Sequence, residues 1–123
     1  MSAPVVVFLH RGGWADRYQA TTLALTAAAL GDAVTLALFF EPLRLWTEGR
    51  FDEGAPGEAA AAKVGSLTEV LEEGRRALGV RVVACDTALR LAGVGAEGAA
   101  RLDGVMTLPA LWQLARGGRA LVV

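Results

Sequence analysis

Three short, continuous apolar runs, separated by segments of helical character, most constrain the fold of this chain. The runs occupy residues 5–9, 34–40 and 80–84, and each is rich in β-branched or aromatic side chains. Because none of them alternates polar with apolar residues, each predicts a strand buried on both faces. Strands separated by helices imply βαβ units and therefore a parallel sheet covered on both sides.

Capping residues mark the helix that follows the first strand. Asp16 and Gln19 are spaced as an N-cap and its reciprocal partner, which predicts a helix from residue 16 to about residue 30. Gly31 can take the left-handed conformation that ends such a helix. After the second strand, residues 41–46 are typical of a short helix or turn.

A second capping box, Ser66 with Glu69, opens another helix, and Gly79 closes it. Gly74 inside this helix costs about 1 kcal/mol relative to alanine. The side chains that we expect the helix to bury are Leu67, Val70, Leu71 and Leu78.

The last third of the chain continues the same alternation of elements. Thr107 can cap the final helix, with Pro109 in its permissive first turn. The elements expected here are helical stretches over residues 87–92 and 97–102, a strand over 105–107, a helix over 108–116 and a strand over 119–123.

These patterns predict an α/β fold for one domain spanning residues 1–123. We expect a three-layer α/β/α sandwich with a mostly parallel sheet of about five strands, flavodoxin-like in architecture, whose strand order the sequence leaves open. Residues 47–62 are rich in glycine, alanine and acidic side chains and show no apolar period. We interpret them as a mobile loop or lid with some helix over residues 58–62.

Charge and composition exclude several classes of partner. The 12 basic and 13 acidic residues give a formal net charge of −1, so no strong field gathers nucleic acid or an anionic membrane. The longest intense apolar run, residues 33–40, is far below the roughly 20 residues that span a bilayer. A single cysteine and the lack of an export signal favour the reducing cytoplasm.

Cys85 stands where the third predicted strand gives way to a helix-like run. In a parallel sheet this junction lies at the carboxyl edge, where such sheets place their ligands. One thiol cannot form an internal disulfide. Cys85 is therefore either a reactive thiol or a small buried hydrophobic residue, and composition leaves both interpretations open.

A reactive Cys85 must lose its proton, and neighbouring charges decide how readily it does so. A helix N-terminus stabilises an adjacent anion by about 0.3–1 kcal/mol, whereas an ionised Asp86 opposes it. His10 is the candidate catalytic partner, because it can approach Cys85 if the first and third strands are neighbours. Alternatively, His10 is a hydrogen-bonded structural residue. The residues expected to form a pocket beside these two are Arg11, Gly12, Gly13, Trp14, Asp86 and Thr87.

Other sites are less well supported by the spacing of residues. The segment from Arg11 to Gly13 lies between a strand and a helix, but it matches neither the dinucleotide nor the P-loop pattern, so a plain turn is favoured over a phosphate-binding loop. No group of histidine, cysteine and carboxylate residues has metal-ligand spacing. The three tryptophans are core anchors, subunit contacts or the lining of a ligand pocket; they are Trp14, Trp46 and Trp112.

The order and spacing of four segments carry a family resemblance. The segments are residues 16–18, residues 27–40, the strand-to-cysteine run 79–85, and residues 89–94 after the cysteine. Together they resemble the DsrE/DsrF-like family of small sulfur-relay proteins over most of the chain.

This resemblance implies a sulfur carrier or sulfurtransferase-type protein whose cysteine, here Cys85, accepts sulfane sulfur as a persulfide and passes it to a partner thiol. The implied partners are sulfur donor and acceptor proteins or small persulfides, and no cofactor is required. Members of the family commonly form dimers, trimers or hexamers, which would suit the surplus of apolar residues. The rival interpretation is a non-catalytic oligomeric module that binds a small ligand or a protein partner, with Cys85 buried as a structural residue.

Overall fold

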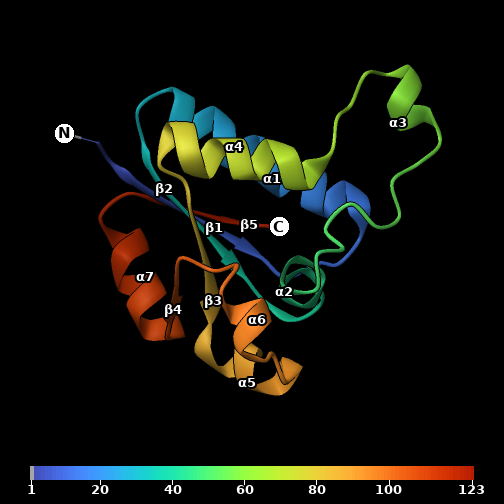
Figure 1. Cartoon of the computed structure of the whole chain (residues 1–123). Coiled ribbons are helices and arrows are strands. Elements are labelled where there is room, and N and C mark those ends of the chain that lie inside the picture. Colours follow the sequence, from blue (N-terminus) through green and yellow to red (C-terminus); the bar gives the residue numbers. More distant parts are fainter. Residues whose placement is uncertain (1) are drawn as a thin grey trace.

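The computed structural model describes residues 2–123 and alternates strands with helices along the chain (Figure 1). The elements, in chain order, are β1 (Pro4–Leu9), α1 (Trp14–Ala29), β2 (Ala33–Leu38), α2 (Phe40–Thr47), α3 (Glu58–Ala61), α4 (Leu67–Leu78), β3 (Arg81–Cys85), α5 (Asp86–Ala92), α6 (Ala96–Ala99), β4 (Gly104–Met106), α7 (Leu108–Arg116) and β5 (Arg119–Val122). All three strands predicted from continuous apolar runs are confirmed within two residues at either end.

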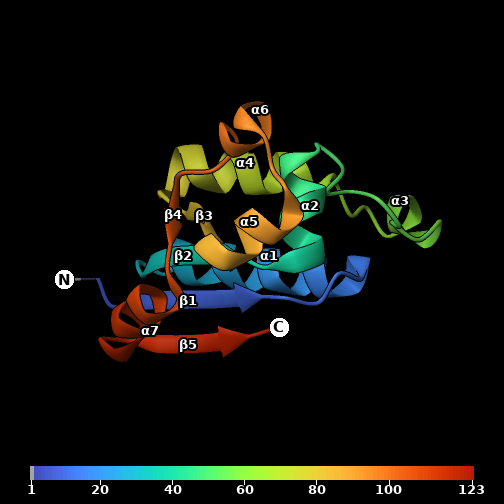
Figure 2. The same ribbon diagram turned by 90° about the horizontal axis from the view of Figure 1, so that it is seen from below.

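The five strands form one sheet in the order β4-β3-β2-β1-β5, and every neighbouring pair is parallel. The chain therefore adds strands in one direction from β1 to β4 and then returns to place β5 on the other side of β1. Figure 2 shows β5 beside β1 at this end of the sheet. β2 lies between β1 and β3, so the first and third strands are not neighbours.

Helices cover both faces of the sheet, which confirms the three-layer α/β/α sandwich. Alternation along β1 sends Val5 and Val7 into a large core shared with α1 and α4, and Val6 and Phe8 into a smaller core under α7. In Figure 1, α1 and α4 lie above the sheet and α7 lies below it. Within residues 2–123 no helix is long and apolar enough to cross a membrane.

The first helix begins two residues before the predicted start. Its N-cap is Gly13, not Asp16, and Asp16 lies in the first turn, where a carboxylate is stabilised by the positive end of the helix dipole. Gly31 follows the helix with a φ of 99°, the left-handed conformation expected of it. The capping pattern thus identified the helix but assigned its cap to the wrong residue.

The α4 helix confirms its predicted caps and corrects part of its predicted core. Ser66 accepts a hydrogen bond from the backbone N–H of Glu69 at 3.2 Å, and Gly79 ends the helix at a φ of 71°. Leu67 and Leu71 are buried, but Val70 and Leu78 are exposed because the buried stripe continues through Gly74 instead. A Cβ on Gly74 would lie 3.1 Å from Leu25 of α1, so this glycine permits the close packing of the two helices.

The segment between α2 and α4 is not the free lid that its composition predicted. Phe51 is fully buried in the main core, and Asp52 accepts hydrogen bonds from Ser66 Oγ at 2.6 Å and from the backbone N–H of Leu67. The predicted helix within the segment is present as α3. In both views α3 stands well away from α5 (Figures 1 and 2).

The elements after Cys85 match their predictions closely. Thr107 caps α7 by accepting a hydrogen bond from the N–H of Ala110 at 3.2 Å, and Pro109 occupies the first turn. β4 is short and pairs with β3, while β5 returns to pair with β1. The return of β5 brings the end of the chain beside the first strand, which shapes the surface described below.

Candidate functional site

Cys85 ends β3 at the carboxyl edge of the sheet and is also the N-cap residue of α5. It pairs in register with Met106 of β4 and joins the main core together with Ala88, one turn further along α5. The residue is only 7 % exposed. Its side chain makes no capping hydrogen bond to α5 within the described part of the chain. A reagent therefore reaches the thiol only if neighbouring side chains move.

His10 and Cys85 lie in the same row across the sheet, but Phe39 stands between them. Leu9 pairs with Leu38, and Leu38 pairs with Ala84, so the next residue of each strand continues the row. Adjacent strands are about 4.8 Å apart, which puts the Cα atoms of His10 and Cys85 about 10 Å from each other. The structure therefore does not bring the two proposed catalytic residues into hydrogen-bond contact.

A small cavity lies between α2 and α5, and its lining includes Ala88, one helical turn after Cys85, but not Cys85 itself. It has a volume of about 130 Å³ and is lined by Ala88 with Phe40, Arg44, Leu91 and Ala92. Phe40 has a φ of 49°, which is unusual for a bulky residue, and its side chain is 56 % exposed. The sequence analysis did not identify this cavity, because α2 and α5 pack together only in the folded chain.

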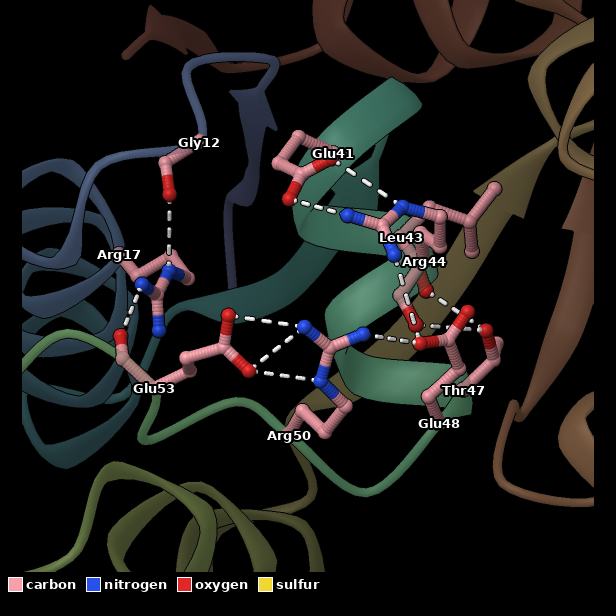
Figure 3. Close-up of polar contacts among 9 residues, drawn as sticks. All are labelled: Gly12, Arg17, Glu41, Leu43, Arg44, Thr47, Glu48, Arg50 and Glu53. Carbon is pink, nitrogen blue, oxygen red and sulfur yellow. Dashed lines mark hydrogen bonds and ion pairs between the residues drawn. The ribbon is translucent and has the colours of Figure 1, made fainter.

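Arg44 is the cation of this cavity, but it forms ion pairs with Glu41 of α2 and with Glu48, which follows α2. Its guanidinium contacts the carboxylates of Glu41, at 2.5 Å, and Glu48, at 3.4 Å (Figure 3). The hydrogen bonds and charge of Glu41 raise the pKa of Arg44 further above its ordinary value. Arg44 therefore stays charged, while its two partners offset its field at the cavity.

The two other predicted neighbours of the thiol, Asp86 and Thr87, lie in the first turn of α5. Asp86 forms an ion pair with Arg90 at 3.1 Å, and Arg90 also donates to Thr87 Oγ1 at 3.4 Å. Asp86 and Arg90 are substantially exposed, so solvent screens the pair. Arg90 thus offsets part of the negative charge that Asp86 brings beside the sulfur.

The turn from Arg11 to Trp14 has the features of a plain connection between strand and helix. A Cβ on Gly12 would overlap the side chain of Glu41, and a Cβ on Gly13 would lie 2.9 Å from a carboxylate oxygen of Asp16. Two carboxylates at the start of α1 would repel a phosphate. This arrangement supports the plain turn over a phosphate-binding loop.

Arg17 ties this turn to the segment after α2. Its side chain is almost completely buried and donates hydrogen bonds to the backbone carbonyls of Gly12, Phe51 and Glu53. Figure 3 shows the bonds to Gly12 and Glu53, and beside them the ion pair between Glu53 and Arg50. This cation is therefore used to hold the fold and is not available to a ligand.

A larger apolar cavity lies beside α7 at the carboxyl ends of β1 and β5. Its volume is about 380 Å³, and its lining residues are Phe8, His10, Phe39, Leu108, Trp112 and Val122. The sequence analysis named only His10 and Trp112 among these. The sequence signal that could have identified the cavity is the apolar character of Leu108 and Val122. Both side chains remain exposed in the folded chain.

The three tryptophans have three different roles. Trp46 is a core anchor: it is 2 % exposed and donates from Nε1 to the carbonyl of Arg101 at 2.9 Å. Trp14 stacks on Tyr18 with ring centroids 5.3 Å apart. Trp112 is 56 % exposed and lines the cavity beside α7, and Trp14 also lines a cavity, with residues of the segment that contains α3, so the pocket interpretation agrees with both.

The described residues, 2–123, contain no group of three or more histidine, cysteine, aspartate or glutamate side chains placed to hold a metal ion. The polar clusters that do exist consist of arginine and carboxylate pairs. Most of these pairs lie within one helix or one turn, whereas the pair of Arg75 and Asp103 joins separate elements.

The parallel sheet, its strand order and its helical layers define a three-layer α/β/α protein of flavodoxin-like architecture with a cysteine at the end of its third strand. The same fold is found in the ychN protein from E. coli, whose crystal structure matches with a TM-score of 0.68 over 100% of both chains at 20% sequence identity. By sequence, no family model and no curated protein matches.

Proposed function

We propose that this protein is a sulfur carrier that holds sulfane sulfur as a persulfide on Cys85 and passes it to a partner thiol. The observation that carries the proposal is the position of the single cysteine, at the carboxyl edge of a fold shared with the ychN protein over the whole chain. Ligands of open parallel sheets bind at that edge. The donor and acceptor are proteins or small molecules that carry a persulfide or a thiol.

The transfer is an exchange between sulfur atoms and needs no external oxidant. The Cys85 thiolate attacks the outer sulfur of a donor persulfide, R–S–SH; the new Cys85–S bond forms while the bond between the two donor sulfurs breaks. The donor leaves as the thiolate RS⁻, and Cys85 becomes Cys85–S–SH. An acceptor thiolate then attacks the outer sulfur in the same way, which forms the acceptor persulfide and regenerates the Cys85 thiolate.

The burial of Cys85 sets a condition on this chemistry. At 7 % exposure the sulfur is shielded, so donors reach it through local opening around the cavity formed by Phe40, Ala88 and their neighbours. Such shielding would also protect a stored persulfide from oxidants. We expect small persulfides and polysulfides to react faster than bulky thiol reagents.

Intact-mass spectrometry after exposure to polysulfide and gel filtration tests the proposal directly. The wild-type protein should gain about 32 Da, one sulfur atom, and lose it on reduction, whereas Cys85→Ser should gain nothing. Met106→Leu serves as a matched control, because it alters the strand partner of Cys85 but retains the thiol. If the native wild type gains no sulfur and the thiol reacts only in denaturant, Cys85 is structural and the carrier proposal is wrong.

We also propose that copies of the chain associate through the surface beside Cys85. Phe40 and Leu91 are 56 % and 73 % exposed there, and both line the small cavity between α2 and α5. Association would bury these side chains and increase the shielding of the sulfur. Leu91→Glu should lower the mass measured by sedimentation equilibrium if this surface is the contact, and Leu30→Glu, at the far end of α1, should not.

A non-catalytic binding module is the second candidate, and the burial of Cys85 favours it. A cysteine in an apolar core is a common packing residue, and the cavity beside α7 offers a place for a ligand that does not involve the thiol. Thiol labelling of the native protein with a small reagent separates the candidates: labelling under native conditions supports the carrier, and labelling only after unfolding supports the module.

A further inference from the structure

The cavity beside α7 has a closed floor and an open rim. Phe8 is 7 % exposed and its ring centroid lies 6.1 Å from that of Phe39, so these two aromatic side chains form the floor. Leu108, Trp112 and Val122 are 51 %, 56 % and 70 % exposed and form the rim. Five of the six lining side chains thus offer only apolar or aromatic surface.

Its position in the sheet is the position at which open α/β sheets bind ligands. The strand order reverses at β1, because the chain proceeds from β1 through β4 on one side and then places β5 on the other. The cavity lies at the carboxyl ends of β1 and β5, which provide Phe8 and Val122. In such sheets the crevice beyond the carboxyl ends, at the point of reversal, is the usual binding site.

One titratable side chain faces this apolar surface. His10 follows β1 directly, its backbone N–H donates to the carbonyl of Val123 at 3.0 Å, and its side chain is exposed at the cavity. This hydrogen bond fixes the position of the His10 backbone, while the imidazole ring remains accessible. An imidazole both donates and accepts hydrogen bonds, so it suits a ligand with a single hydroxyl or carbonyl group.

We propose that this cavity binds a small, planar aromatic molecule that bears one hydroxyl or carbonyl group, its ring against Phe39 and Trp112 and its polar group on His10. The volume of about 380 Å³ lies within the range of 300–1,000 Å³ typical of small-molecule sites. Apolar walls with one well-placed polar group are the usual composition of such sites. The proposal does not depend on sulfur transfer, because Cys85 is not among the lining residues.

The size of the surface argues against a protein as the main occupant. Six side chains form the cavity, whereas a stable protein interface takes about 20–30 residues from each partner. The concave floor of two packed aromatic rings is also better matched to a single flat molecule than to an extended contact. Self-association through α7 is therefore the alternative that the experiment must separate.

Titration with 2-naphthol, followed by amide chemical shifts, tests the proposal on the full chain. Shifts should saturate and concentrate on β1, α7 and β5. Trp112→Ala should weaken binding about tenfold by removing a stacking partner, and Leu108→Gln should also weaken it. Leu30→Ala, which removes a more exposed apolar side chain, 81 % accessible, at the other end of the molecule, should leave the affinity unchanged. Because Trp112 and Leu108 are half exposed, both variants should keep the wild-type melting temperature.

The role of His10 is tested by comparing the binding of 2-naphthol with that of naphthalene, which lacks the hydroxyl group. Wild type should bind 2-naphthol several-fold more tightly than naphthalene, and His10→Ala should remove this preference. Cys85→Ser should bind both probes as wild type does, whether or not the sulfur-carrier proposal holds. Non-saturable shifts, shifts spread over the whole chain, or a dimer that Trp112→Ala dissociates and 2-naphthol does not perturb would each overturn the proposal.

Discussion

His10 and Cys85 lie on opposite sides of Phe39, in one row across the sheet and two strands apart. At about 10 Å the separation is close to the screening length of physiological salt. We therefore expect His10→Ala to change the rate at which iodoacetamide modifies Cys85 by less than about twofold. A fall of tenfold or more, measured at matched pH, would mean that the imidazole assists the thiol through a rearrangement that the structure does not contain.

Substitutions of Asp86 and of Arg90 should change the alkylation rate of Cys85 in opposite directions. Asp86→Asn removes the carboxylate beside Cys85 and leaves Arg90 without its partner, so the thiolate is favoured and alkylation should accelerate several-fold. Arg90→Gln leaves the charge of Asp86 uncompensated and should slow the alkylation of Cys85. Rates at several salt concentrations provide the check, because both effects should shrink as salt screens the exposed pair. Equal rates for the two variants would show that these charges do not act on the sulfur.

Asp103 joins α4 to the sheet, and its contacts predict a dependence of stability on pH. It accepts hydrogen bonds from Arg75 at 2.6 and 3.0 Å and from the backbone N–H of Val82 at 2.7 Å. Partial burial alone would raise the pKa of Asp103, but the hydrogen bonds from Arg75 and Val82 outweigh it and lower the pKa below its ordinary value. Asp103 therefore stabilises the fold above the pKa of an unfolded aspartate, about 3.9, and this contribution is lost as the pH falls through the lower, folded pKa.

Urea unfolding between about pH 5 and pH 2 measures this contribution. The unfolding free energy of the wild type should decrease over this range by more than that of Asp103→Asn, so that the two proteins converge at the acid end. Glu58→Gln is the matched control, because Glu58 is an exposed carboxylate of α3, and its removal should leave the slope unchanged. A constant difference between wild type and Asp103→Asn at every pH would contradict the assignment.

The strands β1, β2 and β3 were predictable because their burial on both faces leaves a continuous apolar signature. The strand order was not, because the sequence of β5 does not indicate on which side of β1 it will pair. The strand order determines the arrangement of the site. β2 separates His10 from Cys85, and β5 brings Val122 to the cavity beside α7. The separation of the predicted catalytic pair and the presence of the unpredicted cavity are consequences of the same strand order.

Local patterns failed where tertiary contacts override them. Phe51 is the only aromatic residue in a polar, glycine-rich stretch, and it anchors that stretch in the core beside Trp46 at a centroid distance of 5.3 Å. Arg17 completes the anchor by donating to the carbonyl of nearby Gly12 and to the carbonyls of Phe51 and Glu53 in the distant stretch. A buried arginine leaves no periodic signal, so composition alone suggested a free loop at this position.

Thr21 and Thr47 are both buried in helices, and their hydroxyl groups predict opposite responses to the same substitution. Thr47 Oγ1 donates to the carbonyl of Leu43 at 2.9 Å, whereas Thr21 Oγ1 has no hydrogen-bond partner among residues 2–123.

Valine replaces the threonine hydroxyl with a methyl group of nearly the same size and has a similar helix propensity. Thr21→Val should therefore raise the free energy of unfolding by about 1 kcal/mol, because a buried polar atom without a partner is removed. Thr47→Val should lower it by about 1 kcal/mol, because a satisfied hydrogen bond is lost. Urea unfolding of the two variants and of the wild type measures these changes. A decrease in the free energy of unfolding for Thr21→Val would mean that the Thr21 hydroxyl finds a hydrogen-bond partner in solution.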